Sequence, residues 1–370
     1  MQARAAVLWG LNEEWKVTDV QLDDPEPGEV LVRMSAAGLC HSDEHIVTGD
    51  IPMALPAVGG HEGAGVVESV GEHVTSLQPG DHVVMSFIPS CGRCRPCVSG
   101  SQNLCDLGAH LMLGTPIANG RHRMFADGQG LAPMSLVGCF ASHQVLHESS
   151  LIKIDPEIPL DKAALVSCGV ATGWGSAVNT ARVGAGDVVV VVGVGGIGAN
   201  AVQGARMAGA RWIVAVDPVE FKHELAKRFG ATHVAKDVYA AYALVNEMTR
   251  GEMADSAIIT TGVATGDLLA PVMSLVKKGG TVVVTAIAPF SQSEVSLSLF
   301  ELTLWQKEIR GSLFGGGNPR ADIPRILTLY GDGSLLLDEL ITKTYSLDDI
   351  NEGYSDMRAG RNVRGVVVFD

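Results

Sequence analysis

The stretch Val188-Val-Val-Val-Val192-Gly193-Val194-Gly195-Gly196-Ile197-Gly198 decides the fold of the second half of the chain. Five consecutive valines are typical of a buried parallel strand. A G-x-G-x-x-G pattern that follows a strand and opens a helix is typical of a dinucleotide-binding turn. The first glycine permits the tight turn, the second lets the backbone approach a pyrophosphate, and the third lets helix and strand pack closely. Unpaired N–H groups at the helix start would face the phosphates.

Strands and helices alternate beyond this turn. Helical spacing covers 197–208 and 222–229, and apolar β-branched runs cover 212–216, 257–261 and 280–285, with another strand beginning at 230. This alternation predicts an α/β fold with a doubly wound parallel sheet.

Asp217 ends the second predicted strand, 19 residues beyond Gly198. Its carboxylate can accept hydrogen bonds from both adenosine ribose hydroxyls and would repel a 2′-phosphate, so NAD is favoured over NADP. The alternative is an ordinary aspartate at a strand end.

The first half of the chain has a different pattern. Short strands are predicted at 30–35, 65–71 and 83–87, separated by turn residues, which indicates a β-rich lobe. A chain of 370 residues also exceeds the size of a typical single core, so two domains are expected.

Four cysteines lie in one short loop with the spacing C-x2-C-x2-C-x7-C: Cys91, Cys94, Cys97 and Cys105. Four thiolates complete a tetrahedral zinc shell with no open position, so this zinc would be structural. Two disulfides are the alternative.

Cys40, His61 and Cys168 offer two thiolates and one imidazole. Three protein ligands leave a fourth zinc position open for water or substrate, which is typical of a catalytic zinc. The alternative for each residue alone is a buried thiol or a core histidine. Cys139 has no predicted role beyond that of an inert buried thiol.

Composition excludes several classes of protein. The net charge of −14 and the pI of about 5.2 oppose nucleic-acid binding, which needs a basic surface. The start of the chain is a poor signal peptide, and the most apolar stretch, 187–202, is interrupted by glycines, so no membrane span is expected. Free thiolate ligands indicate a reducing compartment, and we expect a cytoplasmic protein.

Taken together with Pro27-Gly-Glu-Val-Leu-Val32 and Gly59-Gly-His-Glu-Gly-Ala-Gly65, these motifs resemble the zinc-dependent alcohol dehydrogenases of the medium-chain dehydrogenase/reductase superfamily. The chain also resembles the actinobacterial nicotinoprotein subgroup, which holds its nicotinamide tightly and is assayed with an artificial acceptor. The resemblance implies a GroES-like catalytic domain at 1–169 and 313–370 and a Rossmann domain at 170–312. It further implies two zinc ions per chain, NAD(H), an alcohol or aldehyde substrate, an electron acceptor that reoxidises bound NADH, and a homodimer or homotetramer with 304–313 as a candidate subunit edge.

The resemblance also implies roles for single residues near the zinc. The alcohol proton would pass through Ser42 and a cofactor ribose hydroxyl to His45, a histidine near the surface. Asp43 would orient the zinc-bound imidazole of His61, and Glu62 would lie behind the metal. Phe87 matches a pocket residue that contacts substrate, although a core aromatic needs no such role.

Four residues match cofactor-binding positions of the family: Thr172 against the nicotinamide, Lys222 at the adenosine ribose, and His41 and Arg364 at the pyrophosphate. Surface positions without function are the alternative for Lys222 and Arg364.

Rival functions remain open at this point. A thiol-adduct (formaldehyde-type) dehydrogenase of the same superfamily would need a cationic anchor, for which Arg121 and Arg123 in the turn-rich insertion 106–135 are candidates. A zinc-ribbon protein that binds nucleic acid or a partner would lack NAD binding. A zinc-free quinone reductase relative is excluded if both metal sites are real.

Overall fold

The computed structural model describes residues 1–111 and 114–369. The chain divides into two compact units, Met1–Cys168 with Asn318–Asp370, and Gly169–Gly317.

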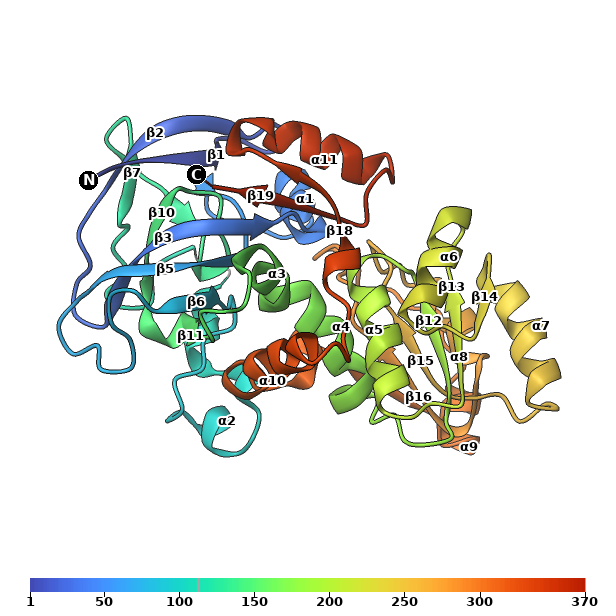
Figure 1. The fold of residues 1–370 in the computed structure, drawn as a ribbon. Coiled ribbons are helices and arrows are strands. Elements are labelled where there is room, and N and C mark those ends of the chain that lie inside the picture. Colours follow the sequence, from blue (N-terminus) through green and yellow to red (C-terminus); the bar gives the residue numbers. More distant parts are fainter. Residues whose placement is uncertain (112–113, 370) are drawn as a thin grey trace. The chain divides into compact units, whose positions relative to one another are not determined.

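The first unit is built mainly from antiparallel strands (Figure 1). One sheet runs in the order β8-β7-β2-β1-β4-β9, with β1 (Gln2–Leu8), β2 (Lys16–Leu22), β4 (Ala57–Val58), β7 (Met124–Ala126), β8 (Gln129–Gly130) and β9 (Ala132–Pro133). The other runs β11-β6-β5-β3-β19-β18 with β10 also on β3: β3 (Glu29–Gly38), β5 (Glu62–Val70), β6 (His82–Met85), β10 (His143–His147), β11 (Leu151–Lys153), β18 (Ile341–Tyr345) and β19 (Arg364–Val368). Helices complete the unit: α1 (His41–Thr48), α2 (Arg95–Val98), α3 (Leu160–Leu165), α10 (Pro319–Gly331) and α11 (Ile350–Arg358).

The pairing of β3 with β5 creates the setting of the site. The strands are antiparallel, and Gly38 at the end of β3 lies opposite Glu62 at the start of β5. Cys40 follows β3 and His61 precedes β5, so this register brings the two side chains together. Cys40 is also the N-cap residue of α1, which ends at the left-handed Gly49 (φ 81°).

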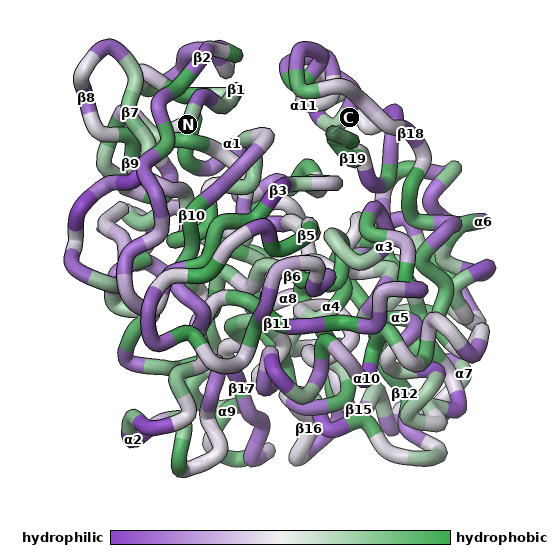
Figure 2. The backbone as a smooth tube through the Cα atoms, turned by 60° about the vertical axis from the view of Figure 1, so that its left-hand side comes forward, coloured by the Kyte–Doolittle hydropathy of each residue, from purple (hydrophilic) through white to green (hydrophobic). Residues whose placement is uncertain are grey.

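The second unit is a parallel sheet in the order β14-β13-β12-β15-β16-β17. Its strands are β12 (Val188–Val192), β13 (Trp212–Val216), β14 (His233–Ala235), β15 (Ala254–Ile259), β16 (Val276–Val284) and β17 (Glu308–Gly311). The five valines of β12 form a continuous hydrophobic stretch in the tube coloured by hydropathy (Figure 2). All five are buried. The strand order reverses at β12, where open α/β sheets bind their ligands.

Helices cover this sheet in two pairs. α5 (Gly196–Met207) contacts α6 (Glu220–Phe229), and α7 (Val238–Met248) contacts α8 (Leu269–Met273). Right-handed crossovers on either side of β12 place these pairs on opposite faces. The unit also contains α4 (Ala171–Gly175), α9 (Leu299–Leu304) and a π-helical turn, Ser176–Thr180.

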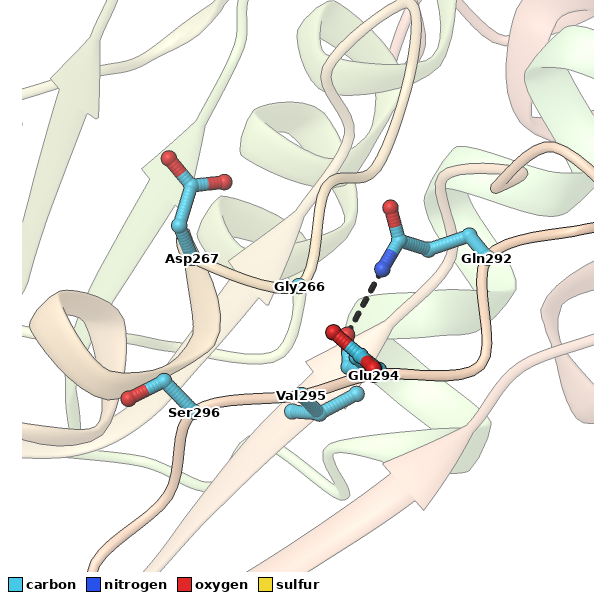
Figure 3. Close-up of a pocket in the computed structure, with 6 residues that line it drawn as sticks. All are labelled: Gly266, Asp267, Gln292, Glu294, Val295 and Ser296. Atoms are coloured by element: carbon cyan, nitrogen blue, oxygen red, sulfur yellow. Dashed lines mark hydrogen bonds between the residues drawn. The ribbon is translucent and has the colours of Figure 1, made fainter.

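The loops that follow β15 and β16 line an open pocket of about 460 Å³. It is lined by Gly266, Asp267, Gln292, Glu294, Val295 and Ser296, and the Gln292 amide donates to the Glu294 carbonyl at 2.6 Å (Figure 3). Its two carboxylates suit a polyanionic cofactor poorly, and the predicted site residues lie elsewhere in the described part of the chain.

Candidate active site and zinc centres

The predicted catalytic ligands meet in the first unit. Cys40, His61, Glu62 and Cys168 are all buried, and one ligand atom of each lies within 4.8 Å of those of the others. Cys168 reaches the group from a π-helical turn, Val166–Val170, that continues α3. Next to it, the Ser167 hydroxyl accepts the Gly63 N–H at 3.2 Å and thereby ties this turn to β5.

The donor set fits zinc. His61 Nε2 is buried and has no hydrogen-bond partner among the described residues, and such an orphaned nitrogen is costly unless it binds something. The Cys168 thiol, which hydrogen-bonds Cys40, holds the pKa of Cys40 well below its usual value, and the charges of His61 and Arg364 act in the same direction. Cysteine sulfur and imidazole nitrogen are the ligands that zinc usually binds in proteins, so this donor set suits zinc.

Asp43 supports two of these ligands. Its Oδ1 lies 3.1 Å from His61 Nδ1, and its Oδ2 accepts the Cys40 N–H at 3.0 Å. Burial opposes protonation of the imidazole, but the charges of Asp43 and Cys40 raise the pKa of His61 well above its usual value. The predicted orienting contact between Asp43 and His61 is therefore present in the structure.

Glu62 forms a buried ion pair with Arg364 of β19. Burial raises the pKa of Glu62 to about 7, although Arg364 opposes this shift. Arg364 was expected at the pyrophosphate. Its guanidinium pairs with the carboxylate of Glu62, which belongs to the ligand group itself. A contact between Arg364 and the cofactor stays a prediction.

The predicted proton-path residues lie on α1. The Ser42 hydroxyl is 3.7 Å from Cys40 Sγ. His45 was expected near the surface, but only 2% of it is exposed, and its Nδ1 contacts Asp50 at 3.0 Å. The Asp50 side chain is 32% exposed, so Asp50 is the group that reaches solvent. The Phe87 ring packs edge-on against His61 at 5.6 Å, whereas His41 is exposed at the start of α1.

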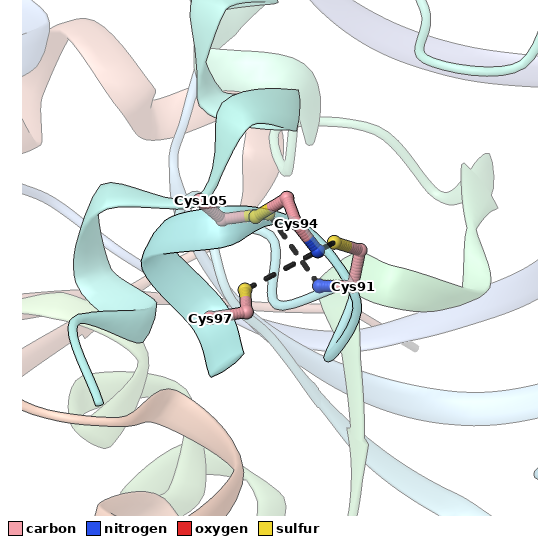
Figure 4. Close-up of side chains that lie close together, drawn as sticks. All are labelled: Cys91, Cys94, Cys97 and Cys105. Carbon is pink, nitrogen blue, oxygen red and sulfur yellow. Dashed lines mark hydrogen bonds between the residues drawn. The ribbon is translucent and has the colours of Figure 1, made fainter. Parts of the chain in front are cut away.

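The four-cysteine loop has the geometry of a closed zinc shell (Figure 4). Sulfur–sulfur distances are 3.9 Å for Cys91 with Cys97 and 3.8 Å for Cys94 with Cys105. Zn–S bonds of about 2.3 Å in a tetrahedron give edges of about 3.8 Å, whereas a disulfide needs about 2.05 Å. All seven cysteines are free. Burial opposes ionisation of Cys91, yet donation from the Arg93 and Cys94 amides lowers its pKa to about 6.

In the second unit, the dinucleotide motif forms the expected turn between β12 and α5. Gly193 has φ +95°, and a Cβ on Gly198 would lie 1.9 Å from the Gly193 carbonyl oxygen, so each position requires glycine. Space is open around Gly195, where a ligand could approach the backbone.

Asp217 follows β13 and lies beside this turn. Its carboxylate accepts the Val194 N–H at 2.8 Å and the Val219 N–H at 3.0 Å, and Lys222 Nζ lies 3.5 Å away. The motif, Asp217 and Lys222 therefore converge within one unit. Thr172 is buried in α4 of the same unit.

The insertion offers no free cationic anchor among its described residues. Arg123 is 3% exposed and donates to Glu29 at 2.7 Å, while it also pairs with Glu26 at 3.0 Å. Arg121 also lies near Glu26, at 3.6 Å, on the exposed surface. Residues 112 and 113 of the insertion lie outside the described residues.

Both halves of the chain match family models: residues 26–156 the alcohol dehydrogenase GroES-like domain, and residues 196–331 zinc-binding dehydrogenase. Over its full length the chain is 50% identical to Alcohol dehydrogenase B of Mycobacterium tuberculosis and covers 99% of that protein. The chain belongs to the zinc-binding medium-chain alcohol dehydrogenases. It is therefore an oxidoreductase that acts on alcohols or aldehydes, and the predicted Rossmann and GroES-like fold class is confirmed.

Three further relatives bear on the kind of alcohol dehydrogenase that this chain is. It is 48% identical over 368 residues to the NDMA-dependent alcohol dehydrogenase of Amycolatopsis methanolica, covering 100% of this chain and 99% of that one. The crystal structure of benzyl alcohol dehydrogenase from Acinetobacter calcoaceticus superposes with a TM-score of 0.92 at 30% identity, over 100% of both chains. An S-(hydroxymethyl)glutathione dehydrogenase of Paracoccus denitrificans is 37% identical and thus more distant, so the thiol-adduct alternative is disfavoured.

The zinc-ribbon alternative is wrong, since the match extends over the whole enzyme. Every helix within residues 1–111 and 114–369 is too short or too polar to cross a membrane.

Proposed function

We propose that this alcohol dehydrogenase binds two zinc ions per chain, a catalytic one at Cys40, His61 and Cys168 and a structural one at Cys91, Cys94, Cys97 and Cys105. The observation that carries the proposal is the buried His61 Nε2, which has no hydrogen-bond partner among the described residues, in a side chain grouped with two cysteines. Glu62 is not a permanent ligand in this proposal, because Arg364 holds its carboxylate.

We propose NAD as the cofactor, held by the Gly193–Gly198 turn, Asp217 and Lys222. When bound, zinc supplies a Lewis acid for the substrate oxygen and NAD supplies the hydride acceptor. The residues of this chain orient the substrate and move its proton. Ser42 would accept the alcohol proton and release its own toward His45, and His45, whose Nδ1 lies 3.0 Å from Asp50, would pass a proton on to Asp50 and solvent.

Metal analysis and substrate turnover test the proposal together. Purified enzyme should contain two zinc ions per chain by native mass spectrometry and oxidise alcohols from a panel of primary alcohols when it is supplied with NAD or an artificial electron acceptor. Cys168→Ser should retain one zinc and lose turnover. An active enzyme with a single tightly held zinc would contradict the assignment.

We further propose that NAD(H) stays bound through turnover and is reoxidised in place by a second small acceptor. Similarity to a relative named for its dependence on NDMA supports this. Retention over a preparation needs sub-nanomolar affinity, about −12 kcal/mol or beyond.

The test is to purify the enzyme without added cofactor, denature it and assay the supernatant. About one NAD(H) per chain is expected, with slow turnover on free NAD. An empty supernatant with fast turnover on added NAD would show a dissociable cofactor.

We propose that the enzyme forms a homodimer or homotetramer through the edge of its parallel sheet. β17 is the last strand of the sheet order, within the predicted segment 304–313. Exposed apolar side chains lie near it in sequence, with Phe290 at 81%, Leu299 at 71% and Phe300 at 66% exposure. Light scattering should give a multiple of the 38.8 kDa chain mass, and Phe300→Glu should lower it. A monomeric wild type would refute the proposal.

We also propose a cytoplasmic location, because free thiols persist in a reducing compartment.

A further inference from the structure

A buried carboxylate connects two of the proposed zinc ligands to a distant helix. Asp43 is fully buried. One of its oxygens, Oδ1, contacts the His61 imidazole, and the other, Oδ2, accepts the Cys40 amide and the Tyr354 phenol. The Tyr354 contact is the shortest of the three, at 2.7 Å, and it links residues 311 positions apart. The orientation of Asp43 therefore depends on the phenol as well as on the amide.

Tyr354 is held in place on α11. It is 1% exposed, and its ring packs against both Trp15, stacked at 6.2 Å, and Phe140, inclined at 66° and also at 6.2 Å; these two rings contact each other at 5.8 Å. Trp15 in turn exchanges two backbone hydrogen bonds with the Asn351 side chain, one turn earlier on the same helix. A buried ring packed in this way cannot move its hydroxyl oxygen away from Asp43 without disturbing the core.

We infer that Tyr354 is a positioning residue of the catalytic metal site: its hydroxyl fixes the Asp43 carboxylate, which orients His61 and Cys40 toward the metal. This inference rests on the proposed zinc at that site. It adds α11 to the shell that controls the metal, because outer partners of a ligating histidine set its tautomer and ring orientation.

The chemistry of each partner supports this role. When His61 Nε2 binds a metal, Nδ1 carries the proton and donates it to Asp43 Oδ1. Without the phenol, Oδ2 would keep the Cys40 amide as its only donor among the described residues. A buried carboxylate that has lost a donor is destabilised and can rotate more freely. Burial, together with the charge of Asp43, raises the pKa of Tyr354 well above its usual value. The phenol therefore remains a donor across the working pH range.

The structure also offers a matched control. Tyr345 is likewise buried, at 5% exposure, and donates to a carboxylate, Asp356, at 2.8 Å. Asp356 pairs with Lys343 and Arg361 rather than with a proposed metal ligand. Tyr345→Phe thus removes the same kind of phenol–carboxylate bond in the same unit, together with the bond that Asn362 donates to the phenol at 3.2 Å, and leaves the partners of the proposed metal ligands in place.

The test compares Tyr354→Phe with Tyr345→Phe in the intact enzyme. Zinc release to a colorimetric chelator is followed over time, and Cys168→Ser supplies the release rate of the four-cysteine zinc for subtraction. Loss of a direct partner of a ligand costs roughly 10–100-fold in metal affinity. Since Tyr354 acts one bond further out, we expect release about threefold to tenfold faster in Tyr354→Phe. The visible spectrum of cobalt bound at the site should shift as well, whereas Tyr345→Phe should match wild type in both measurements.

A double-variant cycle provides a second measurement. If Tyr354 acts through Asp43, adding Tyr354→Phe to Asp43→Asn should change release less than it does in wild type. Equal release rates and cobalt spectra for Tyr354→Phe and Tyr345→Phe, or strictly additive effects in the cycle, would overturn the inference. Absence of zinc from the wild-type site is a different result, which would remove the proposed function itself. Circular dichroism melting checks that the variants remain folded.

Discussion

Replacing Asp217 by asparagine should reverse much of the proposed preference for NAD. The carboxylate is 4% exposed, and both of its oxygens accept backbone amides. The asparagine side chain would keep one acceptor oxygen and lose the charge. Charged hydrogen bonds are worth roughly 1.5–3 kcal/mol and neutral ones about 1 kcal/mol. Each of the two ribose contacts then weakens by about 0.5–2 kcal/mol, or about 1–4 kcal/mol in total, which is about 5–900-fold in the Kd for NAD.

Binding of NADP should change in the opposite direction. Two unit charges 4 Å apart repel by about 1–4 kcal/mol at effective dielectric constants between 80 and 20, and Asp217→Asn removes this term for a 2′-phosphate. Both effects lower the ratio of NAD to NADP affinity, so the ratio should fall at least about 30-fold.

Isothermal titration calorimetry on cofactor-stripped enzyme measures both affinities. Asp255→Asn is the matched control, because Asp255 also accepts a backbone amide, that of Val188 at 2.7 Å, and also pairs with a lysine, Lys277 at 2.5 Å. Its partner Val188 lies at the start of β12, away from the dinucleotide turn. An unchanged affinity ratio in Asp217→Asn would refute the reasoning, and an equal fall in Asp255→Asn would trace the effect to general damage of the sheet.

Three further outcomes are expected. Cys94→Ser should lower the melting temperature and yield because structural zinc contributes folding free energy, while Cys168→Ser should keep the fold and NAD binding but lose turnover; equal melting of both proteins would contradict this. His45→Gln should slow alcohol oxidation by about tenfold or more, with recovery by added imidazole, and unchanged rates would remove His45 from the proton path. Lys343, together with Tyr345 and Arg361, holds the pKa of Asp356 well below its usual value. The ionised Asp356 therefore stabilises the folded protein above the unfolded pKa of about 3.9, and this contribution is lost at lower pH. Asp356→Asn should accordingly melt lower than wild type at pH 7, with a difference that narrows below about pH 4; a constant difference would count against the ion pair.

Local patterns predicted the second unit well. The strands at 188–192 and 212–216 are confirmed residue by residue, because apolar β-branched runs in a parallel sheet are buried on both faces. The strand expected at 257–261 runs instead from Ala254 to Ile259. Its polar start conceals it from a hydrophobicity pattern, since Asp255 lies in the strand to accept an amide and pair with Lys277.

The ligand sets could also be predicted, because metal binding restricts residue type and, in the four-cysteine loop, spacing. Contacts between distant segments could not. Tyr354 belongs to no motif, and its bond to Asp43 depends on how α11 packs on Trp15 and Phe140. The burial of His45 and the pairing of Arg364 with Glu62 likewise depend on tertiary packing, for which the sequence gives no periodic signal.

The two ligand groups differ in how much chain each must gather. Cys91 to Cys105 close a short loop, so their sulfurs can enclose an ion with a small loss of chain entropy, before the rest of the protein has folded. Cys40, His61 and Cys168 meet only after β3 has paired with β5 and the turn after α3 has docked. During synthesis the ribosome therefore delivers the first group complete while the last ligand of the second is still to be made. A cell short of zinc should accumulate folded but inactive enzyme, which later addition of zinc would activate without refolding.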